Sequence, residues 1–211
     1  MAARRVAVAP MGPDALSAVV DLHRRALPDT LNARCGPAYL AALYRALLAS
    51  DLGVGYVASS EGLLAGFVSG TLHREKLSQR LLLRMTPRHR ARLLLEVLRR
   101  PWELVDQAAL ARAQRHMARL GHHAALLTIA VEPGFRQEGV GHQLTLALAR
   151  RFHQAGLASF HVDTREANAA ARRFYEALDF SFAGTWLGNR FYVLDVAQSH
   201  RRARGEPRKP T

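Results

Sequence analysis

The sequence predicts one α/β domain, of the α+β type, in which a sheet is flanked by helices and interrupted by a helical insertion. Three observations support this fold. The chain has 211 residues, 49% apolar and 22% charged, as expected for a globular protein with one well-packed core. Strand-like and helix-like stretches alternate in the first and last thirds of the chain. Between them, residues 74–120 have helical periodicity and no strand pattern.

The first third predicts a strand, two helices and an antiparallel pair of strands. Pro37 suits the first turn of the second helix, where its missing N–H is not needed. The expected order is a strand (4–10), a helix (14–27), a polar loop (28–36), a second helix (37–50) and two strands around a turn at 60–62.

The insertion is expected to consist of two or three helices, because Pro87 and Pro101 interrupt it. Apolar stripes run among its arginines, and their members are Leu77, Leu81, Leu93, Leu94, Val97 and Leu98. These stripes must cover a sheet edge, an acceptor cleft or a second subunit, so a homodimer is compatible with the sequence.

The last third returns to alternating strands and helices. The expected elements are a strand (124–131), a helix (139–156), a strand (158–163), a helix (168–178) and a closing antiparallel pair (180–186 and 190–196). We therefore expect a single domain over residues 1–197, followed by a basic, disordered tail over 198–211.

The net charge of +13 is concentrated in two places. The insertion has 12 Lys/Arg against 4 Asp/Glu, and the tail has 5 against 1. A nucleic-acid binder would use such a field for phosphate contacts, and an acidic small substrate would also be attracted by it. We favour solvated basic helices and do not expect a nucleic-acid partner, because Trp102 is the single aromatic residue of the insertion and offers no stacking platform.

Cysteine content and hydropathy limit the class of protein further. Cys35 is the single cysteine, which excludes an internal disulfide and a cysteine zinc cluster, and we expect no metal. No secretory signal is recognisable, and no window has about 18 apolar residues in a row. We expect a soluble cytoplasmic protein without a membrane segment.

The stretch "VEPGFRQEGVGHQ" places Gly139 and Gly141 between a strand and a helix, which is an arrangement typical of a phosphate site. A nucleoside triphosphate loop is excluded, because it requires Lys-Ser or Lys-Thr where His142 and Gln143 stand. The sequence lacks the third glycine of a dinucleotide-binding motif. It does have an acidic residue, Asp163, about 20 positions later, so this alternative stays open. A tight turn without a ligand is the simplest alternative.

Two segments together indicate a family. "RQEGVG" is an instance of Arg/Gln-x-x-Gly-x-Gly/Ala, and "NAAARRFYEALDF" has Asn followed seven residues later by Tyr. In this order and spacing, residues 124–186 resemble the GCN5-related N-acetyltransferases, the GNAT family. The resemblance implies a mixed, mainly antiparallel sheet and an enzyme that transfers an acetyl group from acetyl-CoA to an amine. Asp179 stands where relatives have Gly, in a turn that Asp also tolerates.

The resemblance also implies how the cofactor is held. Backbone N–H groups of the loop would bind the pyrophosphate, and Asn168 would contact the pantetheine arm. Asn168 is also a candidate helix N-cap. Ile129, Ala130 and Val131 would pair with the pantetheine as with an added strand, which requires the two neighbouring strands to separate. The loop residues concerned are Arg136, Gln137, Glu138, Gly139, Val140, Gly141 and His142.

Two catalytic residues are implied as well. Tyr175 stands where the family has its general acid, although it could instead be a core aromatic residue. Asp163 resembles the acidic base of ribosomal-protein alanine acetyltransferases, and Glu132 is the second candidate. The expected acceptor is a small-molecule primary amine, including anionic ones such as an amino-sugar nucleotide. One alternative is a protein N-terminus or a lysine as the acceptor. Another is a non-catalytic protein that binds CoA or nucleic acid.

Overall fold

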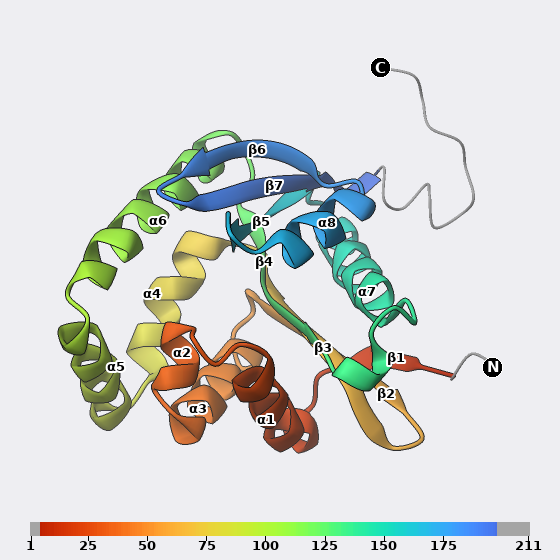
Figure 1. Ribbon diagram of the computed structural model, residues 1–211, viewed down its shortest axis with the longest axis horizontal. Helices are drawn as coiled ribbons and strands as arrows, with labels where there is room; N and C mark the ends of the chain where they lie inside the picture. Colours follow the sequence, from red (N-terminus) through yellow and green to blue (C-terminus); the bar gives the residue numbers. More distant parts are fainter. Residues whose placement is uncertain (1–4, 198–211) are drawn as a thin grey trace.

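The computed structural model describes residues 5–197 and contains one seven-stranded sheet in the order β1-β2-β3-β4-β5-β7-β6 (Figure 1). Neighbouring strands are antiparallel except β4 and β5, which are parallel. The predicted mixed, mainly antiparallel sheet is therefore confirmed, and the predicted tail over 198–211 lies outside the described residues. The strands are β1 Ala7–Pro10, β2 Gly53–Ser60, β3 Leu63–Thr71, β4 Ala124–Val131, β5 Ser159–Arg165, β6 Ser181–Trp186 and β7 Asn189–Asp195.

The helices follow the predicted order, with the short helices α2 and η2 in addition. The loop expected over 28–36 contains a short helix, α2, because the hydroxyl of Thr30 accepts a hydrogen bond from the Ala33 N–H (3.4 Å) and caps its start. The helices are η1 Pro13–Ala15, α1 Leu16–Ala26, α2 Leu31–Arg34, α3 Pro37–Leu48, α4 Arg74–Arg84, α5 Pro87–Arg99, α6 Trp102–Arg119, η2 Pro133–Phe135, α7 Val140–Gln154 and α8 Ala169–Ala177.

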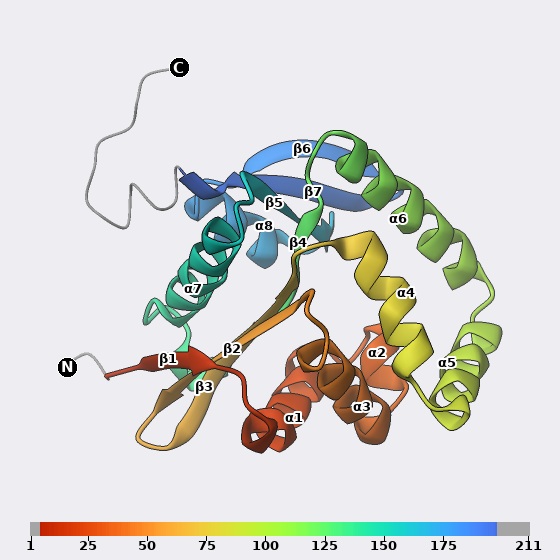
Figure 2. The same ribbon diagram turned by 180° about the vertical axis from the view of Figure 1, so that it is seen from behind.

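Helices cover both faces of the sheet (Figures 1 and 2). On one face, α7 and α8 bury apolar side chains against the sheet, including Leu144, Phe160 and Tyr192. On the other face, α1 and α3 pack around Phe67 of β3. Burial of this apolar surface is the main stabilising contribution on each side of the sheet.

The helical insertion between β3 and β4 is confirmed and forms an arc from the end of β3 to the β6–β7 hairpin (Figure 2). Its last helix, α6, packs Ala113 and Met117 against Phe191 of β7. The predicted apolar stripes are covered only in part. Leu77 is fully buried, whereas Leu94 and Leu98 are 58% and 62% exposed.

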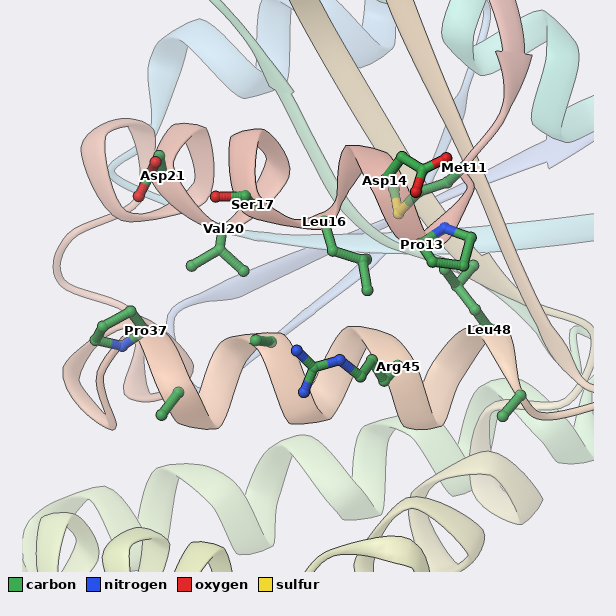
Figure 3. A pocket seen from close by; sticks show the side chains of 13 residues that line it. Met11, Pro13, Asp14, Leu16, Ser17, Val20, Asp21, Pro37, Arg45 and Leu48 are labelled. Carbon is green, nitrogen blue, oxygen red and sulfur yellow. The ribbon is translucent and has the colours of Figure 1, made fainter.

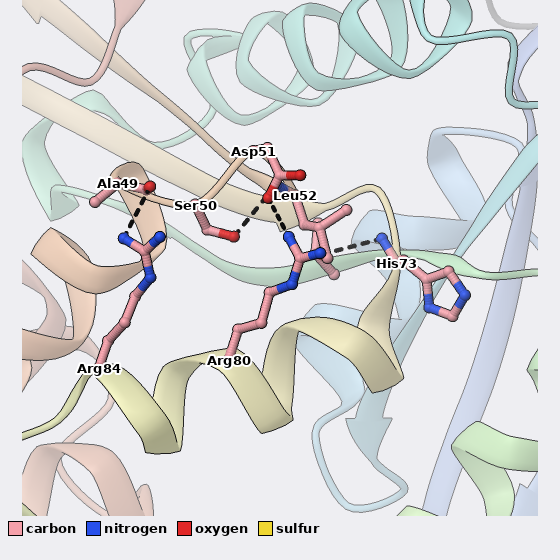
Figure 4. A network of polar contacts seen from close by, with 8 residues as sticks. Ala49, Ser50, Asp51, Leu52, His73, Arg80 and Arg84 are labelled. Carbon is pink, nitrogen blue, oxygen red and sulfur yellow. Dashed lines mark hydrogen bonds and ion pairs between the residues drawn. The ribbon is translucent and has the colours of Figure 1, made fainter.

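Several arginines of the insertion attach it to the rest of the domain or to itself. In α4, Arg80 forms an ion pair with Asp51, and Arg84 donates a hydrogen bond to the Ala49 carbonyl (3.0 Å; Figure 4). In α5, both Arg92 and Arg99 contact the Glu96 carboxylate, at 3.3 and 2.8 Å. Part of the positive charge of the insertion is therefore engaged in contacts within the protein and does not contribute to a free basic surface.

Candidate functional site

The parallel strands β4 and β5 separate shortly after they begin. Their backbone pairing covers only Ala124 with Phe160 and Ala125 with His161, although β4 continues to Val131 and β5 to Arg165. A bulge in β4 accompanies the separation, because Ser69 of β3 faces Thr128 and Gly70 faces Leu126, so that Leu127 has no partner in the register. The outer part of β4 therefore has an edge that β5 does not cover.

The backbone polar groups on that edge belong to Ile129 and Val131. The Glu132 N–H donates a hydrogen bond to the Ala65 carbonyl of β3 (2.9 Å). Because backbone groups alternate sides along a strand, Ala130 also faces β3, and Ile129 and Val131 face the opposite side. The Val131 carbonyl accepts a 3.4 Å hydrogen bond from Arg136 Nε. The side chain of Ala130 is buried in the cluster with α1 and α3, and its backbone groups face β3. Of residues 129–131, only Ile129 and Val131 can therefore offer backbone groups to the pantetheine arm.

The amino end of α7 is the second part of the site. Gly139 is the N-cap of α7 and adopts a left-handed conformation (φ 77°), as does Gln137 before it (φ 66°). Because glycine has no side chain, nothing from the N-cap residue occupies the free N–H groups of the first turn. A Cβ at Gly139 would meet no atom within 4 Å, so the surroundings of the N-cap residue are open. Such a helix start attracts anions.

Gly141 differs from Gly139 in what it contacts. A Cβ at Gly141 would lie 2.8 Å from Phe174 Cε2 and 3.7 Å from Val131 Cγ2. The absence of a side chain at Gly141 therefore lets α8 and the end of β4 pack against α7. A phosphate against the main chain at these two glycines stays a prediction, and the structure shows in addition that Gly141 makes room for Phe174.

The remaining predicted loop residues are placed around this helix start. Arg136, Glu138 and His142 are exposed. Asn168 is the N-cap of α8, where its Oδ1 accepts a hydrogen bond from the Ala171 N–H (3.0 Å). Asp179 takes the left-handed turn position expected of it (φ 63°).

Asp163 lies near the end of β5, in the part of the strand that has left β4. Burial raises the pKa of its carboxyl group, and the Arg74 guanidinium and a hydrogen bond from the Gln114 amide act in the opposite direction. A carboxyl group with a raised pKa is better matched to accept a proton near neutral pH than an ordinary aspartate.

Tyr175 of α8 is buried, with 5% of its surface exposed, among the rings of Phe174, Phe180 and Tyr192. Burial raises the pKa of the Tyr175 hydroxyl, and the charge of Asp163 raises it further. The two predicted catalytic residues are thus close enough to influence each other, and Tyr175 keeps its proton at neutral pH.

Two other residues singled out in the sequence have structural partners. Glu132, the second candidate base, forms an ion pair with Arg25 at the end of α1. Cys35 is buried beside Tyr39 and Met85, and burial raises the pKa of its thiol to about 11. A thiol with so high a pKa is a poor nucleophile at neutral pH.

Three residues near Asp163 were not recognised from the sequence. Arg74 and Gln114 belong to the insertion, and His161 is fully buried two residues before Asp163 in β5. His161 Nδ1 donates a hydrogen bond to the His122 carbonyl (3.0 Å), which leaves Nε2 as an acceptor, and Nε2 has no partner among the described residues. Single arginines, glutamines and histidines in helices and strands carry no motif that would have identified them.

A groove of about 1000 Å³ lies elsewhere, between η1–α1 and α3 (Figure 3). It is lined by Asp14, Asp21 and Arg45 together with apolar side chains. None of the predicted cofactor or catalytic residues lines it. The groove is therefore separate from the site between β4, β5 and α7.

Comparisons with known proteins agree with this geometry. A model of the family described as "Acetyltransferase (GNAT) family" matches residues 16–180. The [ribosomal protein bS18]-alanine N-acetyltransferase of Escherichia coli (strain K12) is 37% identical over 60 residues, which are 28% of this chain and 40% of that protein. The chain thus matches less than half the length of this curated relative.

Solved structures agree with the fold over most of the chain. The ribosomal-protein-S18-alanine N-acetyltransferase from Escherichia coli is 16% identical, with a TM-score of 0.56 over 91% of this chain and 94% of that one. The structure of yncA from Salmonella typhimurium with its cofactor acetyl-CoA is also 16% identical, with a TM-score of 0.57 over 90% and 94%.

Within the described residues, no helix has the length and apolar character needed to cross a membrane. The family match covers more than half of the chain and includes both sequence motifs. The chain therefore belongs to the acetyltransferase (GNAT) family, as those motifs predict.

Proposed function

We propose that this protein is an acetyl-CoA-dependent N-acetyltransferase that acts on a primary amine by direct attack in a ternary complex. The observation that carries the proposal is the separation of β4 and β5 after Ala125 and His161, beside the open amino end of α7. This arrangement offers a strand edge for the pantetheine arm and free N–H groups for the pyrophosphate. Two solved structures that share the fold, yncA with acetyl-CoA and the paia N-acetyltransferase from Thermoplasma acidophilum with coenzyme A, support the choice of donor.

In this proposal the cofactor extends from α7 along β4. The N–H groups of residues 139–142 bind the pyrophosphate, and Arg136 adds charge at the surface. Ile129 and Val131 pair with the pantetheine, and Asn168 contacts it from the start of α8. The Val131 carbonyl exchanges its 3.4 Å hydrogen bond with Arg136 for one from the pantetheine.

Acetyl-CoA supplies an activated carbonyl carbon and a thiolate leaving group. Asp163 accepts the proton that the amine nitrogen loses as its new C–N bond forms. Tyr175 donates its hydroxyl proton to the sulfur as the C–S bond breaks. The raised pKa values of both groups support these roles, because Asp163 is then a better base and Tyr175 remains a proton donor.

Two acceptor classes remain in the proposal. A small amine is the first, and the ion pairs of Arg80, Arg92 and Arg99 weaken the argument that this amine must be anionic. An N-terminal alanine peptide is the second, and the likeness of 60 residues to the bS18-alanine N-acetyltransferase favours it.

The direct test combines an acetyl-CoA thermal shift with release of free thiol in the presence of a panel of small amines and alanine-ended peptides. We expect stabilisation by acetyl-CoA and turnover with at least one acceptor. Asp163→Asn and Tyr175→Phe should retain the thermal shift and lose most of the turnover. A salt-sensitive shift of duplex DNA, without stabilisation by acetyl-CoA, would replace the proposal with a nucleic-acid-binding function.

A further inference from the structure

Arg74 and Gln114 connect two helices of the insertion beside Asp163. The backbone N–H of Arg74, at the start of α4, donates a hydrogen bond to the His123 carbonyl (2.9 Å), and its Nη1 donates one to Ser78 Oγ (3.3 Å). With its amide oriented to satisfy its surroundings, Gln114 of α6 accepts hydrogen bonds from Arg74 Nε and Nη2, both at 3.3 Å. The guanidinium is thereby fixed by partners in α4 and α6.

The same two side chains act on Asp163. Asp163 pairs with Phe191 of β7, the residue against which α6 packs, so both side chains lie on the Asp163 side of the insertion. The charge of Arg74 and a hydrogen bond from Gln114 both lower the pKa of the Asp163 carboxyl group. Asp163 is on β5, so three segments far apart in the sequence meet at one carboxylate. The insertion supplies two of the three side chains.

Attachment of the insertion does not require this cluster. Arg80 and Arg84 join α4 to residues 49–51 at the surface (Figure 4). Glu96 contacts two arginines within α5. Arg74 and Asp163 are both partly exposed, and a charge interaction between partly exposed groups typically contributes little net stability. The placement of Arg74 is therefore better explained by its effect on Asp163 than by the stability of the fold.

We propose that Arg74 and Gln114 are positioning residues that hold the Asp163 carboxylate oriented and ionised, so that the helical insertion completes the catalytic centre. This inference rests on the proposed role of Asp163 as the base. It assigns the insertion a part in the reaction itself.

The balance of groups around Asp163 sets its protonation. Burial and the neighbouring Tyr175 favour the neutral carboxyl group, whereas Arg74 from α4, Gln114 from α6 and a backbone hydrogen bond favour the carboxylate. His161, on the same strand, is neutral at pH 7, since burial lowers its pKa to about 4. Without Arg74, the carboxyl group would keep its proton to higher pH, and the base would be inactive over a wider range.

The experiment is the pH profile of kcat/KM for Arg74→Met and Gln114→Leu. In Arg74→Met we expect the acid limb, which is the fall of kcat/KM at low pH, to move up by about one pH unit or more. The activity lost on that limb should recover as the pH rises. Gln114→Leu should move the limb in the same direction by less, and Arg74→Lys should restore part of the shift. Affinity for acetyl-CoA should not change, because the α7 site is elsewhere.

Two substitutions on the same helices serve as controls. Arg80→Met removes an arginine of α4 that pairs with Asp51, and Gln107→Leu changes an exposed glutamine of α6. Neither should move the acid limb. If Arg74→Met does not fold, as judged by circular dichroism, Gln114→Leu alone decides the question.

Arg74→Met could instead lose activity by the same factor at every pH and keep the acid limb at its wild-type position. That result would show that Arg74 is merely structural and would overturn the inference. Asp163→Asn separates this failure from that of the proposed function. If Asp163→Asn keeps both turnover and the acid limb, the base has been misassigned. If it is inactive and the Arg74 and Gln114 variants keep a wild-type limb, only the positioning role fails.

Discussion

Ala125 and His161 form the last backbone pair between β4 and β5. Beyond this pair the two strands diverge, and the freed edge of β4 leads directly to the glycine-capped start of α7. Phe174 then fills the space beside Gly141, which brings α8 and its Tyr175 against the same region. One divergence of two parallel strands thus organises the proposed cofactor site and the residues proposed to act on the substrate.

Substitution of Gly141 tests the contact with Phe174. Gly141→Ala should lower the free energy of unfolding by about 1–3 kcal/mol, because its Cβ would lie 2.8 Å from the Phe174 ring. Phe174→Leu in the same chain should remove most of that penalty. Urea unfolding of the two single variants and the double variant measures the coupling. Additive effects would show that the contact is not responsible.

Two buried histidines should make stability fall in acid. Burial lowers the pKa of His23 and His161 to about 4, whereas an unfolded histidine titrates near 6.5. The unfolded state therefore binds more protons between about pH 6.5 and pH 4. Each histidine should reduce the free energy of unfolding by about 3 kcal/mol as the pH falls through that range.

The measurement is urea unfolding at several values between pH 7 and pH 5. His161→Phe should flatten the dependence of the free energy of unfolding on pH. An unchanged slope in His161→Phe would contradict a neutral, buried His161.

Cys35 should be unreactive in the folded protein. Its thiol is buried and its pKa is raised to about 11, so little thiolate exists near neutral pH. We expect Ellman's reagent to react with the native protein at least about 100-fold more slowly than with the urea-unfolded protein. Cys35→Ala should retain turnover. Rapid stoichiometric reaction of the native protein, or loss of turnover in the variant, would point to a covalent role.

Local patterns predicted most of the fold. Residues 124–131 form an apolar run that only Thr128 interrupts, as expected for a buried strand, and the structure has β4 over the same residues. The short helix α2 was missed, because four residues are too few for a helical period to be visible. The exposed Leu94 and Leu98 show that an apolar stripe predicts a helix without predicting what covers it.

The candidate site was predictable only where a motif spans it. The loop through Gly139 and the segment from Asn168 to Tyr175 each carry their signal within a few residues. Arg74, Gln114 and Asp163 are separated by many residues along the chain. They meet only because α4 contacts α6 and because α6 packs against β7, the strand beside β5. Similarly, the interaction of Gly141 with Phe174 depends on the angle between α7 and α8, which no local pattern encodes.

The central claim is that the start of α7 binds the pyrophosphate of acetyl-CoA. The Gly139→Ala substitution tests this claim most directly, and Gly156→Ala is the matched control. Both glycines are left-handed (φ 77° and 75°) and border α7 at opposite ends, and a Cβ at either would meet no atom within 4 Å. Both variants therefore bear a similar backbone strain of about 1–2 kcal/mol.

Calorimetric titration with acetyl-CoA supplies the measurement. The account predicts that Gly139→Ala weakens binding by at least about tenfold, because a methyl group on the N-cap residue would crowd a pyrophosphate held against the first turn of α7. It predicts that Gly156→Ala binds like the wild type. Equal affinity of the two variants for acetyl-CoA, or no binding by the wild type, would contradict it.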